Sequence, residues 1–183
     1  MSSSRIKKMV LAGMFLALGL VLPFLTGQIP EIGKKLSPMH IPVLLCGFIC
    51  GWQYGLIVGV ITPVLRSLMF GMPALFPQAV GMAFELGAYG LSSALLYRFF
   101  KQWKVAGIYI TLVLSMLIGR IVWGLASVVL YSVGVPEQDF TFQMFLAGGF
   151  INAVPGIVLH LILIPVILIG LKRAGVMRGL EED

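Results

Sequence analysis

The chain has 183 residues, of which 59% are hydrophobic and 11% are charged, and its mean hydropathy is +1.02. Soluble domains carry about 25% charged residues, so the composition excludes an ordinary soluble protein and indicates an integral membrane protein. The net charge of +6 could suggest nucleic-acid binding, but the basic residues mostly flank apolar stretches and form no patch interleaved with exposed aromatics.

The first expected membrane helix covers about residues 9–26, after the basic sequence MSSSRIKK. This beginning imitates a secretory signal, but no small-x-small cleavage site ends the apolar run, so we expect a retained helix. Gly13, Ala17 and Val21 share one face of it, and small residues at this spacing allow another helix to approach closely. The face is expected either to contact a partner or to pack inside the bundle.

Two patterns in the following segments could suggest a binding site, and neither meets the requirements. A phosphate-loop interpretation fails because Gly27 and Gly33 are separated by five residues and Lys35 stands where Ser or Thr is required. Cys46 and Cys50 lie four apart in an apolar stretch without further ligands nearby. We expect them to be small buried residues rather than a metal or redox site.

Five more apolar stretches follow the first helix. Since about 20 apolar residues cross a hydrocarbon core of about 30 Å, the sequence predicts six spans. They cover about residues 9–26, 39–50, 54–70, 78–99, 105–133 and 145–171. The second and third are short and interrupted by Gly and Pro, which membranes tolerate where a segment lines a cavity or packs within protein. The predicted fold is an all-α integral membrane protein, one domain over residues 1–183, without repeated halves.

The distribution of basic residues predicts the orientation of these spans. Six spans place both termini on one side of the membrane. Nine Lys or Arg residues flank the spans on that side, and two lie on the other. The positive-inside rule therefore predicts cytoplasmic termini. The nine are Arg5, Lys7, Lys8, Arg98, Lys101, Lys104, Lys172, Arg173 and Arg178, and the two are Lys34 and Lys35.

With this topology, polar side chains from five helices share the outer half of the membrane. Ionisable groups in apolar sequence are expensive and by default suggest a ligand site. Two arginines against one glutamate leave a net charge of +1, which favours a small organic monoanion because a guanidinium binds a carboxylate with two hydrogen bonds. The candidate ligand-binding residues are His40, Arg66, Gln78, Glu85, Arg120 and Asn152, with Phe84 and Trp123 adjacent to the charged positions in sequence.

Each of these residues also has a structural interpretation. Glu85 and Arg120 could form an ion pair without any ligand, and Arg66 could extend to the external interface. His40 stands at the start of a span, where an interfacial or capping residue is common. Asn152 could hydrogen-bond between helices.

Nothing else in the spans indicates chemistry. His160 is alone on an apolar face and is expected to be a buried packing residue, while Tyr89 and Tyr131 are typical of a core or an interface belt. The chain contains no nucleophile–base pair, metal-ligand cluster or paired carboxylates, so we expect neither an enzyme nor a bound cofactor or metal. No selectivity-filter sequence indicates an ion channel.

Six spans in fewer than 200 residues, a small-residue face on the first helix, and the run LSPMHIPVLLCGFICGWQYGLIVGVITPVLRSLMFGMPALFPQAVGMAFEL resemble the substrate-binding S components of energy-coupling factor (ECF) vitamin transporters. Residues 37–85 are most similar to the pantothenate-type branch. The family usually carries two alanines four apart on its first helix, facing the coupling protein, and Gly13 and Ala17 occupy the matching positions here.

The resemblance implies a subunit that binds a vitamin near the outer face. It then associates with a transmembrane coupling protein and two ATPases, and topples to carry the ligand inward. Pantothenate, a monocarboxylate with hydroxyl and amide groups, suits the net positive site. Pyridoxine, a thiamine precursor, riboflavin and biotin are the alternative vitamins. A membrane scaffold with purely structural buried charges is the alternative from another class.

Overall fold

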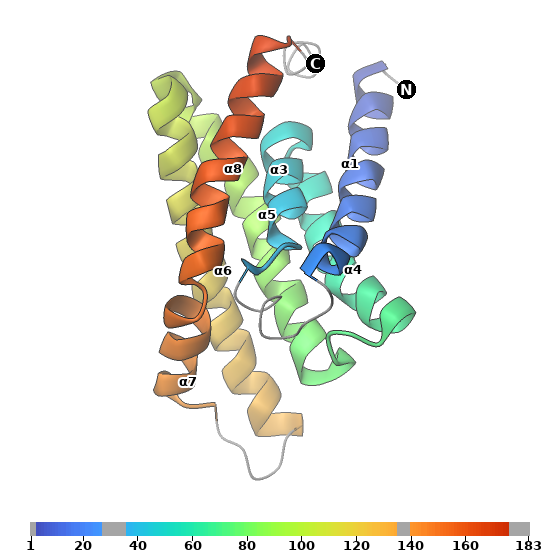
Figure 1. The fold of residues 1–183 in the computed structure, drawn as a ribbon, viewed down its shortest axis with the longest axis vertical. Helices are drawn as coiled ribbons and strands as arrows, with labels where there is room; N and C mark the ends of the chain where they lie inside the picture. Colours follow the sequence, from blue (N-terminus) through green and yellow to red (C-terminus); the bar gives the residue numbers. More distant parts are fainter. Residues whose placement is uncertain (1–2, 27–35, 135–139, 176–183) are drawn as a thin grey trace.

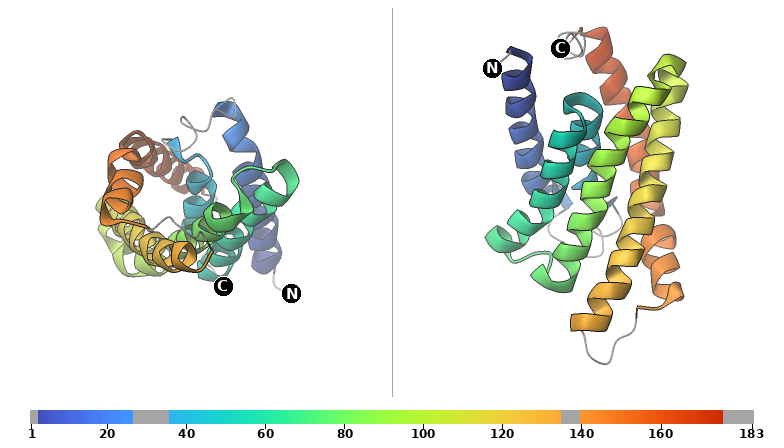
Figure 2. Two further views of the ribbon diagram at one scale, coloured as in Figure 1. Left: turned by 90° about the horizontal axis from the view of Figure 1, so that it is seen from below. Right: turned by 180° about the vertical axis from the view of Figure 1, so that it is seen from behind.

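The computed structural model describes residues 3–26, 36–134 and 140–175, and it is helical with no strand over those ranges. Its α-helices are α1 (Ser3–Val21), α3 (His40–Cys50), α4 (Trp52–Phe70), α5 (Val80–Phe100), α6 (Lys104–Gly134), α7 (Phe142–Leu146) and α8 (Val154–Arg173). Short 3₁₀ or π turns occupy Leu22–Thr26, Leu75–Ala79, Lys101–Trp103 and Ala147–Ile151. The start of α1, the end of α8 and the α5–α6 connection lie at one end of the bundle (Figures 1 and 2).

The structure confirms an all-helical protein with several apolar helices. Four helical stretches are long and apolar enough to cross a membrane: Ser4–Leu25, Trp52–Phe70, Leu75–Val133 and Phe142–Arg173. The third of them contains both α5 and α6. The 11 residues of α3 extend only about 16 Å at 1.5 Å per residue, short of the hydrocarbon core of about 30 Å. The number of six crossings therefore stays a prediction, because α3 cannot span the core by itself.

The last expected span is interrupted. Instead of one helix, the chain forms α7, a π turn and a bend at Asn152 and Ala153 before α8 begins. Two adjacent glycines, Gly148 and Gly149, weaken the helix within the π turn. Pro155 then lies in the first turn of α8, where its missing N–H is harmless.

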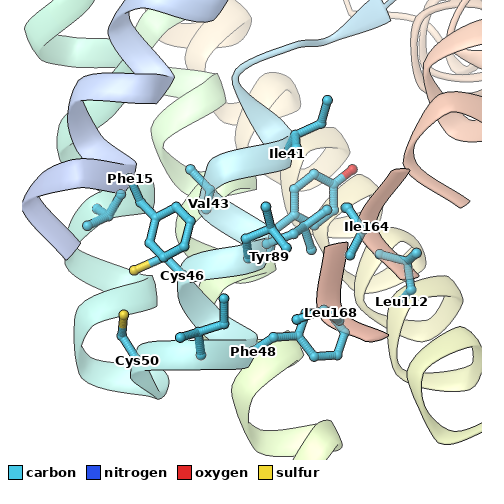
Figure 3. Packing of buried hydrophobic residues seen from close by; sticks show 14 of the residues in the cluster. Phe15, Ile41, Val43, Cys46, Phe48, Cys50, Tyr89, Leu112, Ile164 and Leu168 are labelled. Carbon is cyan, nitrogen blue, oxygen red and sulfur yellow. The ribbon is translucent and has the colours of Figure 1, made fainter. Parts of the chain in front are cut away.

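The short helix α3 forms the centre of the bundle. All of its residues are buried, and α1, α4, α5 and α8 pack around it. A helix that is apolar on every side is stable only when it is surrounded in this way. Figure 3 shows Phe15 of α1, Tyr89 of α5 and Leu168 of α8 around the side chains of α3. Cys46 and Cys50 are free and buried here, which confirms the expectation of small core residues.

Glycines allow α4 and α5 to approach at backbone distance. A Cβ added at Gly90 would lie 2.1 Å from the carbonyl oxygen of Gly55, and one added at Gly55 would lie 2.5 Å from that of Gly90. On the α3 side, a Cβ at Gly47 would lie 2.5 Å from the Gly90 oxygen. Backbone atoms cannot move aside as a side chain can, so these glycine contacts set how closely α3, α4 and α5 pack together.

We expect Gly90→Ala to lower the free energy of unfolding by about 1–3 kcal/mol, because the added methyl group overpacks a backbone contact. Gly13→Ala is the matched control. A Cβ at Gly13 has no atom within 4 Å, so its effect should stay within about 1 kcal/mol. Unfolding of the purified variants in detergent measures both, and equal stability of the two variants would contradict the close approach.

Candidate functional site

Five buried side chains form a polar cluster inside the bundle: His40 of α3, Glu85 and Tyr89 of α5, Arg120 of α6 and His160 of α8. The Oε1 atom of Glu85 is its centre. Nη1 of Arg120 lies 3.0 Å from that oxygen, and the hydroxyl of Tyr89 donates a hydrogen bond to it over 3.1 Å. The cluster therefore joins four helices around one carboxylate.

Helix geometry explains why Glu85 and Tyr89 act together. They are four residues apart on α5, so they lie on the same face one turn apart. On the antiparallel α6, Gly119 makes room for the ring of Tyr89, since a Cβ there would lie 2.1 Å from Cε1 of that ring. Arg120 follows directly in sequence and reaches Glu85 beside the packed ring.

His40 completes the cluster from the first residue of α3. Its Nε2 lies 3.5 Å from Oε1 of Glu85, which is close enough for an ion pair but does not have hydrogen-bond geometry. The His40 ring lies 5.2 Å from the ring of Tyr89 and 5.9 Å from that of His160, centroid to centroid, stacked on the latter at 24°. Each of the five side chains thus contacts at least one other through an ion pair, a hydrogen bond or a ring contact.

Arg66 lies in a different environment, against the end of α1. Its Nη1 donates a hydrogen bond to the carbonyl oxygen of Leu20. Its guanidinium carbon lies 4.8 Å from the ring centroid of Phe24 and 5.4 Å from that of Phe70, which are within the range of cation–π attraction. These contacts join α1 to α4, and they do not place Arg66 in the polar cluster.

The remaining predicted residues also lie outside the cluster. Gln78 and Asn152 are exposed, and Phe84 is 54% exposed although its neighbour Glu85 is buried. Trp123 is half-buried and contacts Phe140 and Phe145. Of the residues predicted to bind a ligand, the structure brings His40, Glu85 and Arg120 together and leaves the other five apart.

Two members of the cluster were not expected there. Tyr89 was predicted to be an ordinary core aromatic, and His160 a packing residue. The spacing of Tyr89 from Glu85, one helical turn, was a usable signal for the first. For His160 no local pattern is informative, because its contact with His40 joins segments far apart in the chain.

An apolar hollow of about 390 Å³ lies between α6 and α7. It adjoins the aromatic contacts of Trp123, since Phe140 and Phe145 belong to both. Its lining consists of Ile121, Gly124, Leu125, Val128, Phe140, Thr141, Phe142 and Phe145. No member of the polar cluster lines it, so the hollow and the cluster are separate features.

The described ranges contain no group of three His, Cys, Asp or Glu side chains that could hold a metal ion. On the surface of the bundle, Gly13, Ala17 and Val21 of α1 are all exposed. The small-residue face predicted for this helix therefore points away from the described part of the bundle, and packing among the described residues does not account for it.

We expect Glu85→Ala to lower the free energy of unfolding by about 3–5 kcal/mol, because it leaves the buried Arg120 guanidinium without its partner. Tyr89→Phe keeps the ring and removes one hydroxyl, so it should cost about 1 kcal/mol. Unfolding of both variants in detergent tests the difference. Equal losses would show that the ion pair does not organise the cluster.

A family model described as "ECF transporter, substrate-specific component" matches residues 7–168 of the chain. Comparison with curated proteins gave no match, and neither did comparison with solved structures. The match covers α1 almost entirely, all of α3 to α7 and most of α8, and so includes every member of the polar cluster. The chain belongs to the family of substrate-specific (S) components of ECF transporters.

Proposed function

We propose that the substrate of this S component is pantothenate and that the polar cluster binds it. As a member of the family, the chain is a membrane-embedded transporter subunit rather than an enzyme, and it serves a small-molecule substrate together with an ECF module. The proposal adds the identity of the substrate and the place where it binds.

The ion pair of Glu85 and Arg120 is the observation that carries this proposal. Charged groups are expensive inside a membrane helix bundle, so a buried charged group there indicates a substrate or ion site by default. The described residues bury two guanidinium groups, of Arg66 and Arg120, against the single carboxylate of Glu85. The remaining positive charge belongs to Arg66, which lies outside the cluster, so the charges of Arg120 and Glu85 cancel within it. What suits a monoanion such as pantothenate is the planar fork of Arg120.

Arg120 also has a donor available for a carboxylate. Nη1 faces Glu85, while Nε is buried and has no hydrogen-bond partner among the described residues. Since a guanidinium presents its N–H groups as a planar fork, a ligand oxygen can bind Arg120 without displacing Glu85. Arg66, Gln78, Phe84, Trp123 and Asn152 lie outside the cluster and stay predicted contacts for more distant parts of the ligand.

Other vitamins are the principal alternatives. Pyridoxine, a thiamine precursor, riboflavin or biotin would have to use the same buried groups with a different distribution of charge. A scaffold without a ligand would need the cluster only for stability, and membership of the S-component family favours transport over that role.

We further propose that the exposed small residues of α1 contact the transmembrane coupling protein, with two ATPases completing the importer. Open space around Gly13 supports this, because another helix could approach there without displacing any atom of this chain. The start of α1, the end of α8 and the α5–α6 connection lie at one end of the bundle. This arrangement supports cytoplasmic termini, in a bacterial plasma membrane. A C-terminal reporter that is active only in the cytosol tests that orientation.

Pantothenate should stabilise the purified protein in detergent by about 4 kcal/mol at a thousandfold excess over its dissociation constant. The measurement is thermal unfolding with pantothenate, pyridoxine, biotin, riboflavin, thiamine and the thiamine pyrimidine precursor. Arg120→Lys keeps the charge but loses the planar fork, so we expect it to weaken binding about tenfold or more.

Arg66→Lys is the matched variant outside the cluster. Weaker binding in this variant as well would assign Arg66 to the ligand site. Stabilisation by another vitamin alone would overturn pantothenate and keep the transporter. If none of the six compounds shifts the transition, the proposed vitamin class is wrong.

Gly13→Leu should prevent copurification with the coupling protein and abolish vitamin uptake, while vitamin binding to the isolated subunit is retained. Gly170→Leu on α8 is the control, since Gly170 is also exposed with no atom within 4 Å of an added Cβ. Coexpression with the coupling protein and ATPases, followed by affinity purification, gives the result. Equal assembly of the two variants would refute a contact at the α1 face.

A further inference from the structure

His160 has one ring nitrogen occupied and one unused. Its side chain is 1% exposed, in the second turn of α8. Nε2 lies 3.3 Å from the carbonyl oxygen of Ser37, just before α3. The other nitrogen, Nδ1, is buried and has no hydrogen-bond partner among the described residues. Packing of α8 against the segment before α3 explains the contact of Nε2, but it gives no role to Nδ1.

The contact with Ser37 determines what Nδ1 can do. A carbonyl oxygen only accepts, so Nε2 must carry the proton and donate it. In a neutral imidazole the other nitrogen is then an acceptor, with its lone pair in the plane of the ring. His160 therefore has a buried acceptor, Nδ1, on a ring that stacks on His40 of the cluster.

Arg120 presents the complementary group. Its Nε–H is a buried donor without a partner in the described part of the chain, and a guanidinium cannot accept. His160 stacks on His40, whose Nε2 lies 3.5 Å from the same Glu85 oxygen that Arg120 contacts. Native structures leave few buried polar atoms unpaired, and these two have opposite requirements. A single molecule that carries both an acceptor and a donor would satisfy both.

We infer that His160 is a ligand-contacting residue whose Nδ1 accepts a hydrogen bond from a hydroxyl or amide N–H of the substrate, while Arg120 binds an oxygen of the same molecule. The inference rests on the proposed function, because it concerns the same cluster. It defines the substrate class as small organic acids that also carry a hydroxyl or an amide N–H. His160 would then select for the donor and Arg120 for the acid.

Two substitutions of His160 separate the roles of its two nitrogens. In His160→Gln the side-chain amide nitrogen takes the place of Nε2 and can still donate to Ser37, but no acceptor remains at the Nδ1 position. In His160→Asn the shorter amide places a polar atom near the Nδ1 position and loses the contact with Ser37. The affinity of each purified variant for pantothenate, and its thermal unfolding without ligand, are measured in detergent.

We expect His160→Gln to weaken pantothenate binding about tenfold or more with little change in the unfolding temperature. His160→Asn should bind better than His160→Gln and unfold at a lower temperature. Wild-type affinity in His160→Gln would overturn the inference, and so would stronger binding by His160→Gln than by His160→Asn.

Three pantothenate analogues identify the donor. Each lacks one donor group, either one of the two hydroxyls or, by N-methylation, the amide N–H. For one analogue the wild type and His160→Gln should bind alike, because the bond to Nδ1 is absent from both. If His160→Gln binds all three analogues more weakly than the wild type does, the inference is overturned. An internal water would then be the partner of Nδ1.

Failure of the proposed substrate is distinguishable from failure of this inference. If the wild type does not bind pantothenate, the proposed substrate is wrong, and the two variants are compared with the vitamin of the panel that does bind. The same order of affinities would support the acceptor role of His160, and the reverse order would overturn it. Binding of no vitamin to the wild type would overturn both proposals together.

Discussion

The contact between the Glu85 carboxylate and the Arg120 guanidinium, 3.0 Å apart in an apolar bundle, constrains much of the structure around it. A buried charge that loses its partner is strongly destabilising, so α5 and α6 can pack only in a register that brings these two groups together. Gly119 permits that register because the ring of Tyr89 occupies the space where a side chain would lie. His40 and His160 then attach α3 and α8 to the same centre.

Because α3 is short and buried, the polar cluster at its first residue lies inside the protein. Because the helix has 11 residues and is buried on all sides, its first residue, His40, lies within the bundle rather than at a surface. The side chain of this first residue reaches Glu85, with its Nε2 3.5 Å from the carboxylate oxygen. The glycine contact between α4 and α5 encloses the other end of α3, so backbone packing and polar placement depend on each other.

The helix α1 has two different faces, one packed in the core and one exposed. Ala12, Phe15 and Gly19 are buried, with Ala12 and Phe15 in the hydrophobic core, whereas Gly13 and Ala17 are exposed. Arg66 fastens the end of α1 to α4 through Leu20 and the ring of Phe24. A partner at the exposed face would thus contact a helix that is anchored in the same core as the polar cluster.

The sequence by itself determined the class of protein and the approximate helices. Composition and apolar length are sufficient for this, because lipid is a uniform solvent that sorts residues by hydropathy. The depth predicted from the topology associated six polar residues, and the structure brings only His40, Glu85 and Arg120 of them together. Only the tertiary structure decided which side of each helix faces inward, so Phe84 points outward beside a buried Glu85, and Arg66 bonds to α1. Rotation about a helix axis depends on the packing of neighbouring helices. The same packing brings Tyr89 and His160 into the polar cluster. It depends on contacts between segments far apart in the chain, which no local sequence pattern predicts.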